Sequence, residues 1–347
     1  MKLPTFNPAF VKSAEKWVLL LIAGTVAATV GVTLFASGDA LLDHITTIPM
    51  HAVWWLVLAT AVESFLRFWR YHVAMKALGI NIPWWRLMYY YTVGYALIPT
   101  PGKVGTAIRL WLLRQYHGLP YHRTAPLLVM DLLSDTIAMC TLASLCLLLL
   151  EESPRLNMLG WLLSGGIVFA LVVITVAPWL LERSVKAAYF FSGRRRPRLF
   201  ARLQALMRTM SRVLGAKVLF NTIALSFVGW ALIGIAIGYL ASEFGTPSFG
   251  AAAGTLAITL STMGGFLTMM PAGVGGAEVT MAGLFTMFDV PLAKAVLLTA
   301  IVRLIVLWST VLIGLVLLPI AIRNAPKDKS PTKRHAKTTV TVIQTIA

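Results

Sequence analysis

The chain has 347 residues, of which 58% are hydrophobic and 12% are charged, and its mean hydropathy is +0.79. Soluble globular domains carry roughly twice that charged fraction, so the composition excludes a soluble globule and indicates a polytopic membrane protein. The formal charge of +17 could indicate a nucleic-acid partner, but the Lys and Arg residues lie between apolar segments, where they orient the chain in the bilayer. We therefore expect no nucleic-acid binding.

The first two apolar runs predict membrane-spanning helices. Residues 17–38 carry no Lys, Arg or Glu and, at about 20 residues per span, are long enough to cross the bilayer. The run is too long for the apolar core of a signal peptide, so we expect an uncleaved first helix. A second span, 48–68, ends in a group of basic residues that begins at Arg67. Basic residues gather on the cytoplasmic side, which places the N-terminus and this end there.

A shorter apolar segment, 87–98, cannot cross the bilayer and is followed by two helix-breaking prolines. The segment after the break, 104–116, ends in basic residues, and basic residues also precede residue 87. Because both ends are flanked by positive charge, we predict a re-entrant hairpin whose ends are cytoplasmic and whose tip lies inside the membrane. Its tip residues are Pro99, Pro101, Gly102 and Gly105.

A second break occurs in the stretch 269–278, with the sequence MMPAGVGGAE, where Pro271 lies among small residues inside an apolar run. Segment 94–107 aligns with 264–277 at a constant offset, so the chain contains this feature twice. A broken helix at membrane depth persists only where protein or a polar cavity satisfies its backbone groups. We therefore expect a functional site at this tip, which comprises Pro271, Gly273 and Gly275.

Four further apolar runs complete the pattern, at 124–150, 158–181, 218–242 and 291–322. With the first two runs they give about six spanning helices. The flanking charges place the first hairpin on the cytoplasmic side and the second on the outer side. We predict an all-α polytopic membrane protein with two re-entrant broken-helix hairpins in an inverted repeat. Such repeats are typical of secondary transporters, in which half-helix ends contact ions or substrate.

These runs divide the chain into five regions. They are an N-terminal helix (1–47), a first transmembrane repeat (48–181), a cytoplasmic basic amphipathic segment (182–217), a second and inverted repeat (218–322) and a disordered basic tail (323–347). Both termini are then cytoplasmic. Apolar residues recur at helical spacing within 182–217, so this segment either lies on anionic lipid headgroups or is a solvated loop that fixes topology.

Charged residues within the spans and hairpins are the candidate substrate contacts, because each costs roughly 2.5 to 3.5 kcal/mol to insert unless it has a partner or water. They are Lys103, Arg109, Asp131, Asp135, Glu278 and Arg303. Glu63 and Arg67 are also spaced to pair with each other. Asp131 and Asp135 share a helix face and repel each other, so either a basic partner lies between them or one of them is protonated. Arg303 and Arg109 are the candidate partners. Two interpretations stay open. The charges form a buried structural network, or they form a polar pocket in which Arg109 and Arg303 bind an anion and the carboxylates exchange protons or cations.

The regions 94–135 and 264–303 resemble the two signature regions of the lysylphosphatidylglycerol synthase transmembrane, or flippase-like, family of inner-membrane proteins. In the second region the matching residues are Pro271, Gly273, Gly275, Glu278, Pro291 and Arg303. In the first, the matching residues are Gly105, Arg109 and Asp135. The chain departs from the family where an acidic residue should follow Gly105 and where a Glu-Arg pair is replaced by Asp131-Leu132. The resemblance implies lipid translocation.

The resulting hypothesis is a bacterial inner-membrane flippase that moves an anionic phospholipid or a lipid-linked intermediate between leaflets. The alternative is a non-transporting accessory subunit of a lipid-modifying or glycosyl-transferring enzyme. We expect no enzyme activity, metal or cofactor, because no span pairs a nucleophile with a base, no phosphate-binding loop is present, and the six histidines form no HxxxH or HExxH pattern. Membrane lipids are the expected partners. The lipid, the direction, the coupling ion and the oligomeric state stay open.

Overall fold

The structure is a computed structural model that describes residues 48–100, 106–150, 207–246 and 249–326, with isolated positions between 16 and 24 and between 158 and 185. The described elements are all helical, which confirms the all-α class. Four helices among the described residues are long and apolar enough to cross a membrane: α3 (Met50–Ala77), α6 (Tyr121–Leu149), α9 (Ala216–Glu243) and the continuous helix Leu292–Arg323. The protein is therefore a multi-pass membrane protein.

Two broken-helix hairpins lie between these long helices. Hairpin 1 consists of α4 (Trp84–Val93), the 3-10 turn η2 (Gly94–Leu97) and α5 (Ile108–His117). Hairpin 2 consists of α10 (Ala251–Leu267), the 3-10 turn η4 (Pro271–Gly273) and α11 (Gly276–Met287). The breaks fall at the predicted prolines, because a proline removes a backbone donor and obstructs the preceding turn. Pro99 is buried in a turn after η2, whereas Pro101, Gly102, Lys103 and Gly105 lie outside the described residues.

The last long helix is not a uniform α-helix. It begins as α12 (Leu292–Val302), passes through a π-helical turn η5 (Arg303–Trp308) and continues as α13 (Ser309–Arg323). A π-turn widens the helix and is frequently found at functional sites. Here it begins at Arg303, one of the predicted substrate contacts.

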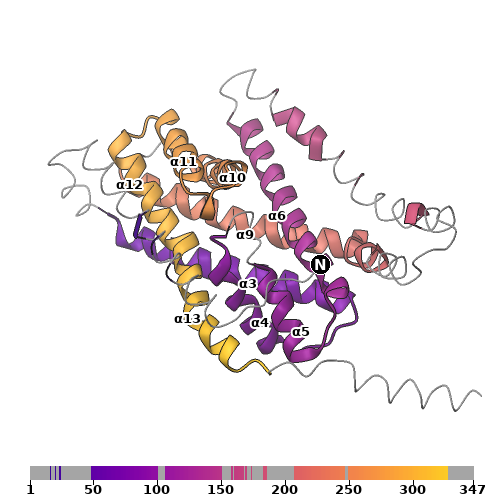
Figure 1. Ribbon diagram of the computed structural model, residues 1–347. Helices are drawn as coiled ribbons and strands as arrows, with labels where there is room; N and C mark the ends of the chain where they lie inside the picture. The colour runs from indigo at the N-terminus through magenta and orange to yellow at the C-terminus, as the bar shows by residue number, and fades with distance from the viewer. Residues whose placement is uncertain are drawn as a thin grey trace, which may run out of the picture.

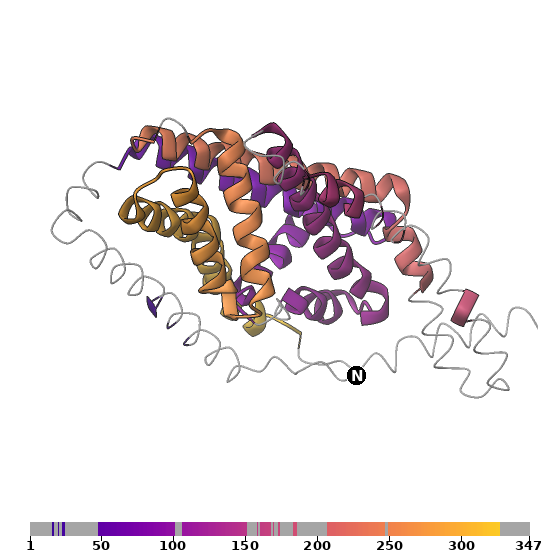
Figure 2. The same ribbon diagram turned by 90° about the horizontal axis from the view of Figure 1, so that it is seen from above.

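The helices α3 and α9 lie side by side and run antiparallel (Figure 1, Figure 2). At one end, Nε2 of His51 is 3.3 Å from Oε2 of Glu243. Toward the other end, Arg70 donates a hydrogen bond to Ser226. These helices open the two predicted repeats, and antiparallel packing of equivalent helices is what an inverted repeat requires.

Each hairpin also packs against the long helix that follows the other hairpin. Hairpin 1 contacts α13 through α4 and η2, and α10 of hairpin 2 contacts α6 (Figure 1). Small residues bring the backbones close, as is usual between helices in membranes. A Cβ atom added to Gly314 of α13 would lie 2.9 Å from the carbonyl oxygen of Thr92. These contacts join both hairpins and the long helices into one bundle.

The structure corrects one predicted boundary. The second span does not end at residue 68, since α3 continues to Ala77. The prediction took the basic residues after Arg67 as the membrane surface, but Arg70 is only 1% exposed and lies inside the bundle. The predicted spans 17–38 and 158–181, the basic segment 182–217 and the tail 323–347 lie wholly or largely outside the described residues, and the five-region division stays a prediction.

Cysteine labelling tests the inverted orientation. In a variant lacking Cys140 and Cys146, a cysteine at Asp289 should react with a membrane-impermeant reagent added outside, whereas cysteines at Arg86 and Arg323 should react only from the cytoplasm. All three sites are exposed, so access to the reagent depends on the side of the membrane. Reaction at Asp289 from the cytoplasm alone would contradict the inversion.

Candidate functional site

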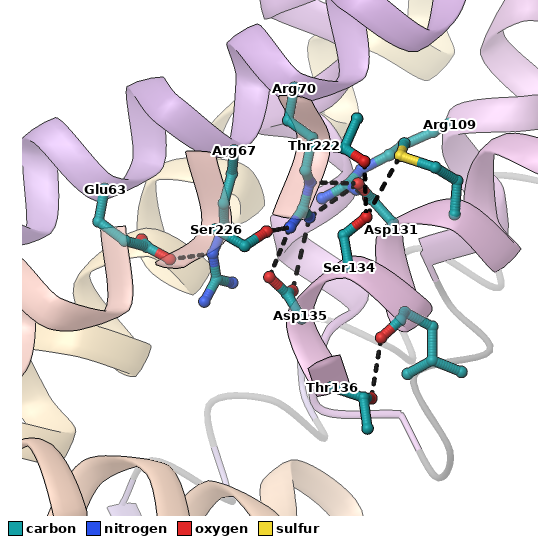
Figure 3. Close-up of polar contacts among 12 residues, drawn as sticks. Glu63, Arg67, Arg70, Arg109, Asp131, Ser134, Asp135, Thr136, Thr222 and Ser226 are labelled. Atoms are coloured by element: carbon teal, nitrogen blue, oxygen red, sulfur yellow. Dashed lines mark hydrogen bonds and ion pairs between the residues drawn. The ribbon is translucent and has the colours of Figure 1, made fainter. Parts of the chain in front are cut away.

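Three charged residues of α3 share one helix face, because Glu63, Arg67 and Arg70 are spaced at i, i+4 and i+7. This face points toward α6 and α9 (Figure 3). Nε of Arg67 forms an ion pair with Glu63, as the spacing predicts. Arg70 points further along the same face and is almost fully buried.

Arg70 is the basic partner of the two aspartates of α6. Its Nη2 lies 2.8 Å from Oδ1 of Asp131, and its Nη1 lies 2.5 Å from Oδ1 of Asp135. The planar guanidinium can donate to both carboxylates at once, which a lysine ammonium cannot do in the same geometry. The positive charge of Arg70 thereby offsets the repulsion between the two aspartates.

Two residues of α9 complete the surroundings of this bridge. Nε1 of Trp230 donates to Oδ1 of Asp135 over 3.3 Å, and Ser226 accepts a hydrogen bond from Arg70. Arg67 lies over the ring of Trp230, with its Cζ 4.8 Å from the ring centroid. The bridge therefore joins α3, α6 and α9 at one point.

Hairpin 1 contributes Arg109 to the same cluster. Nη1 of Arg109 lies 3.1 Å from Oδ2 of Asp131, and its guanidinium carbon lies 3.7 Å from the ring centroid of Tyr91. A cation over an aromatic face is stabilised further when it is desolvated, as it is here. The side chain reaches this position by passing over Gly94, where any Cβ atom would collide with it. Hairpin 1 is thus tied to α6.

A second charged cluster lies at the tip of hairpin 2. Nε of Arg303 is 2.7 Å from Oε1 of Glu278, and its Nη2 donates to the carbonyl oxygen of Ala272 over 2.7 Å. Oε2 of Glu278 accepts the backbone N–H of Gly275 at 2.8 Å, so the carboxylate also caps the start of α11. Arg303 therefore holds the tip at two points.

The tip that Arg303 holds has a strained backbone. Met269 and Ala272 have φ values of 53° and 59°, in the left-handed region that residues with a side chain avoid. Gly273 and Gly275 have φ values of 68° and 84°, where glycine has no comparable cost. Each strained non-glycine residue costs about 1 to 3 kcal/mol and persists only where its surroundings fix it. The bond from Arg303 to Ala272 is one such constraint.

Each of the two hairpins forms one ion pair with the long helix that follows it, and the two ion pairs have opposite polarity. In the first, Arg109 of the hairpin pairs with Asp131 of the following helix, 22 residues later. In the second, Glu278 of the hairpin pairs with Arg303 of the following helix, 25 residues later. Each returning half-helix is therefore fixed to the next long helix by one ion pair that is at least partly buried.

Two adjoining cavities lie between the hairpins. The larger, of about 620 Å³, is bordered by hairpin 1, α6 and α10, and its charged wall residues are Arg67, Arg70, Arg109, Asp131 and Asp135. The smaller, of about 120 Å³, is bordered by the tip of hairpin 2 and the π-turn, and includes Arg303. Both cavities share Arg67, Ile98, Thr262 and Phe266 in their walls. The walls otherwise contain many apolar side chains.

The predicted site residues fall into these two clusters. Arg109, Asp131 and Asp135 come together, as do Glu278 and Arg303. Of the two basic partners expected for the aspartates, Arg109 contacts Asp131, whereas Arg303 lies beside hairpin 2 and pairs there with Glu278. Sequence reasoning missed Arg70, whose spacing from Glu63 and Arg67 could have placed it on their face. Pro271 begins η4, and Lys103 lies outside the described residues.

In the described part of the chain, no group of three or more His, Cys, Asp or Glu side chains could hold a metal ion. The carboxylates of both clusters have guanidinium partners instead. Each cluster is formally neutral, since Glu63, Asp131 and Asp135 balance Arg67, Arg70 and Arg109, and Glu278 balances Arg303. Neutral clusters keep the cost of burying charge low.

We expect Arg70→Gln to lower the free energy of unfolding by about 3 to 5 kcal/mol, because the change leaves two partly buried carboxylates without their shared, buried partner. Thermal or denaturant unfolding in detergent measures the effect. Arg123→Gln is the matched control, since Arg123 is an exposed arginine at the start of α6 and should change stability by about 0.5 kcal/mol or less. Equal destabilisation by both variants would contradict the bridging role of Arg70.

Comparison with known proteins gives one family. Residues 18–314 match the family described as "Lysylphosphatidylglycerol synthase TM region". The match covers both hairpins and both charged clusters. No curated protein matches the chain.

Proposed function

The chain belongs to the lysylphosphatidylglycerol synthase transmembrane family, whose function concerns membrane lipids, and from this premise we propose that it moves an anionic phospholipid or a lipid-linked intermediate between leaflets. The proposed pathway passes through the two cavities between the hairpins. The proposal is transport without a covalent step, and it assigns no catalytic role to the buried carboxylates.

The observation that supports this proposal best is the mixed character of the larger cavity. It combines partly or fully buried arginines and partly buried aspartates with an apolar wall from α6 and α10 that includes Leu128, Leu132, Met263, Phe266 and Leu267. A phospholipid has the same division, because its phosphate needs charge-assisted hydrogen bonds and its chains need apolar contact. A small soluble ion would not need the apolar wall.

The neutral ion clusters suit a substrate that enters and leaves. Each arginine at the cavities has a carboxylate partner, so the empty site buries no uncompensated charge. A lipid phosphate can replace one of these carboxylates, since guanidinium binds phosphate and carboxylate with similar two-bond geometry. Binding then exchanges one partner for another.

The tip of hairpin 2 offers a way to couple this exchange to movement. Arg303 pairs with Glu278 and donates a hydrogen bond to the carbonyl oxygen of Ala272, a residue with a strained backbone. A phosphate that takes over Arg303 would weaken this hold and allow the tip to relax. Movement of a hairpin against the antiparallel pair α3 and α9 would open the site to one side, as inverted-repeat transporters do.

The proposal includes location and partners. We place the protein in a bacterial inner membrane with both termini in the cytoplasm, and we place anionic headgroups against the basic segment 182–217. No second protein is needed for transport. An accessory role beside a lipid-modifying or glycosyl-transferring enzyme is the alternative if the isolated protein moves no lipid.

Blocking the cavities tests the proposal. Thr262 borders both cavities, so Thr262→Phe should fill their junction and lower lipid flux in proteoliposomes at least about tenfold, equivalent to ~1.4 kcal/mol of barrier. The flux of an anionic phospholipid with a headgroup label is measured by quenching from outside and normalised to folded protein.

The matched control is Val316→Phe, which adds similar bulk to a residue of α13 that is 69% exposed and borders neither cavity. It should keep wild-type flux. Equal flux in wild type and Thr262→Phe would remove the cavities as the pathway. No flux in the wild type would favour the accessory role.

A further inference from the structure

The smaller cavity differs from the larger one in the charge of its walls. Among the described residues that border it, the charged side chains are Arg67 and Arg303, and no carboxylate is present. The partners of these arginines, Glu63 and Glu278, border neither cavity within the described chain. Two positive groups therefore face a common space while their negative partners lie behind them.

Arg67 presents its terminal nitrogens to this space. Its Nε pairs with the carboxylate of Glu63, and neither Nη1 nor Nη2 donates a hydrogen bond to another described residue. Figure 3 shows both terminal nitrogens pointing away from Glu63. The side chain is 18% exposed and borders both cavities. These two donors are the fork that binds phosphate or carboxylate through two parallel bonds.

The position of Arg67 is fixed from two sides. Glu63 is pressed against α9, since a Cβ atom on Gly229 would lie 3.1 Å from its Cγ. The Cζ atom of Arg67 lies over the ring of Trp230 in α9, 4.8 Å from the ring centroid. A fork that is already oriented loses little side-chain entropy when it binds an anion.

Arg303 faces the same cavity from the π-turn. Its Nε and Nη2 are used by Glu278 and Ala272, which leaves Nη1 without a hydrogen bond to any described residue. The cavity of about 120 Å³ is several times larger than the space that one water molecule needs, so it can hold a compact anion.

We infer that the smaller cavity is a phosphate-binding subsite in which Arg67 supplies a two-bond fork and Arg303 a further donor. The inference deepens the proposed function and rests on it for the source of the phosphate, which is a phospholipid headgroup or a soluble phosphate ester. Arg67 is then a substrate-binding residue, and Glu63 positions it without contacting the anion.

Binding measurements on the full chain in detergent test the subsite. The probes are dihexanoyl phosphatidylglycerol, glycerol phosphate as the soluble source, and dihexanoylglycerol, which has the same chains without phosphate. The variants are Glu63→Gln and Glu63→Gln/Arg67→Gln, which both remove the buried carboxylate, so that they differ only in the arginine. Arg67→Lys is a third variant that keeps the charge and the pairing with Glu63 but lacks the fork.

The double variant should bind the phosphate probes roughly 10- to 100-fold more weakly than wild type, as expected for lost hydrogen bonds to a charged group. Glu63→Gln should bind at least as tightly as wild type, because loss of the negative charge beside Arg67 strengthens its attraction for an anion, while Trp230 and the amide oxygen of the new side chain keep the guanidinium in place. Its thermal midpoint should rise more on adding the probe. Arg67→Lys should show an intermediate loss. Binding of phosphatidylglycerol alone identifies a lipid source, and equal binding of glycerol phosphate a soluble one.

The subsite is overturned if wild type binds neither phosphate probe, if dihexanoylglycerol binds as well as phosphatidylglycerol, or if both Glu63→Gln variants lose binding equally. It is also overturned if the double variant binds like wild type. Lipid flux in proteoliposomes is measured separately. Normal flux with unchanged binding in the double variant would remove the subsite and leave transport standing, whereas absence of flux in wild type would remove transport itself.

Discussion

The structure depends on one buried guanidinium, that of Arg70, which bridges two aspartates that would otherwise repel each other. Arg70 comes from α3, and the aspartates Asp131 and Asp135 come from α6. From α9, Ser226 accepts a hydrogen bond from Arg70 and Trp230 donates one to Asp135. The contact therefore decides how these three helices pack. In hydrocarbon an unpaired charge is costly, so removal of one member of this network leaves the others at a cost in free energy.

Ion pairs of the same kind hold the two hairpins against the long helices. Asp131 accepts from Arg70 on one oxygen and from Arg109 on the other, so the bridge also anchors hairpin 1. Glu278 and Arg303 anchor hairpin 2 with the charges reversed. Because each hairpin also packs on the long helix that follows the other hairpin, the space between the two hairpins is enclosed on several sides. The cavities are the result of this arrangement, with charged groups at their walls and apolar side chains around them.

Local patterns were sufficient to predict the helices and their breaks. Apolar length predicted the long helices, and Pro99 and Pro271 with their neighbouring glycines predicted the broken hairpins, because both signals act within a few residues. The pairing of Glu63 with Arg67 was predictable for the same reason. The partners of Asp131 and Asp135 were not, since any of several arginines could reach them until the packing of the helices was known. Arg70 was assigned to the membrane surface because it lies within a basic group, although its spacing matched the buried face. The π-turn at Arg303 has no signal in the sequence that we can identify.

Transport as we propose it requires that the two adjoining cavities hold a phospholipid headgroup between the hairpins. The most direct measurement is a density map of the wild-type protein in lipid nanodiscs that contain an anionic phospholipid. The account predicts headgroup density beside Arg67 and Arg303, with chain density along the apolar wall of α6 and α10. Empty cavities, with ordered lipid only on the outer faces of the bundle, would contradict it.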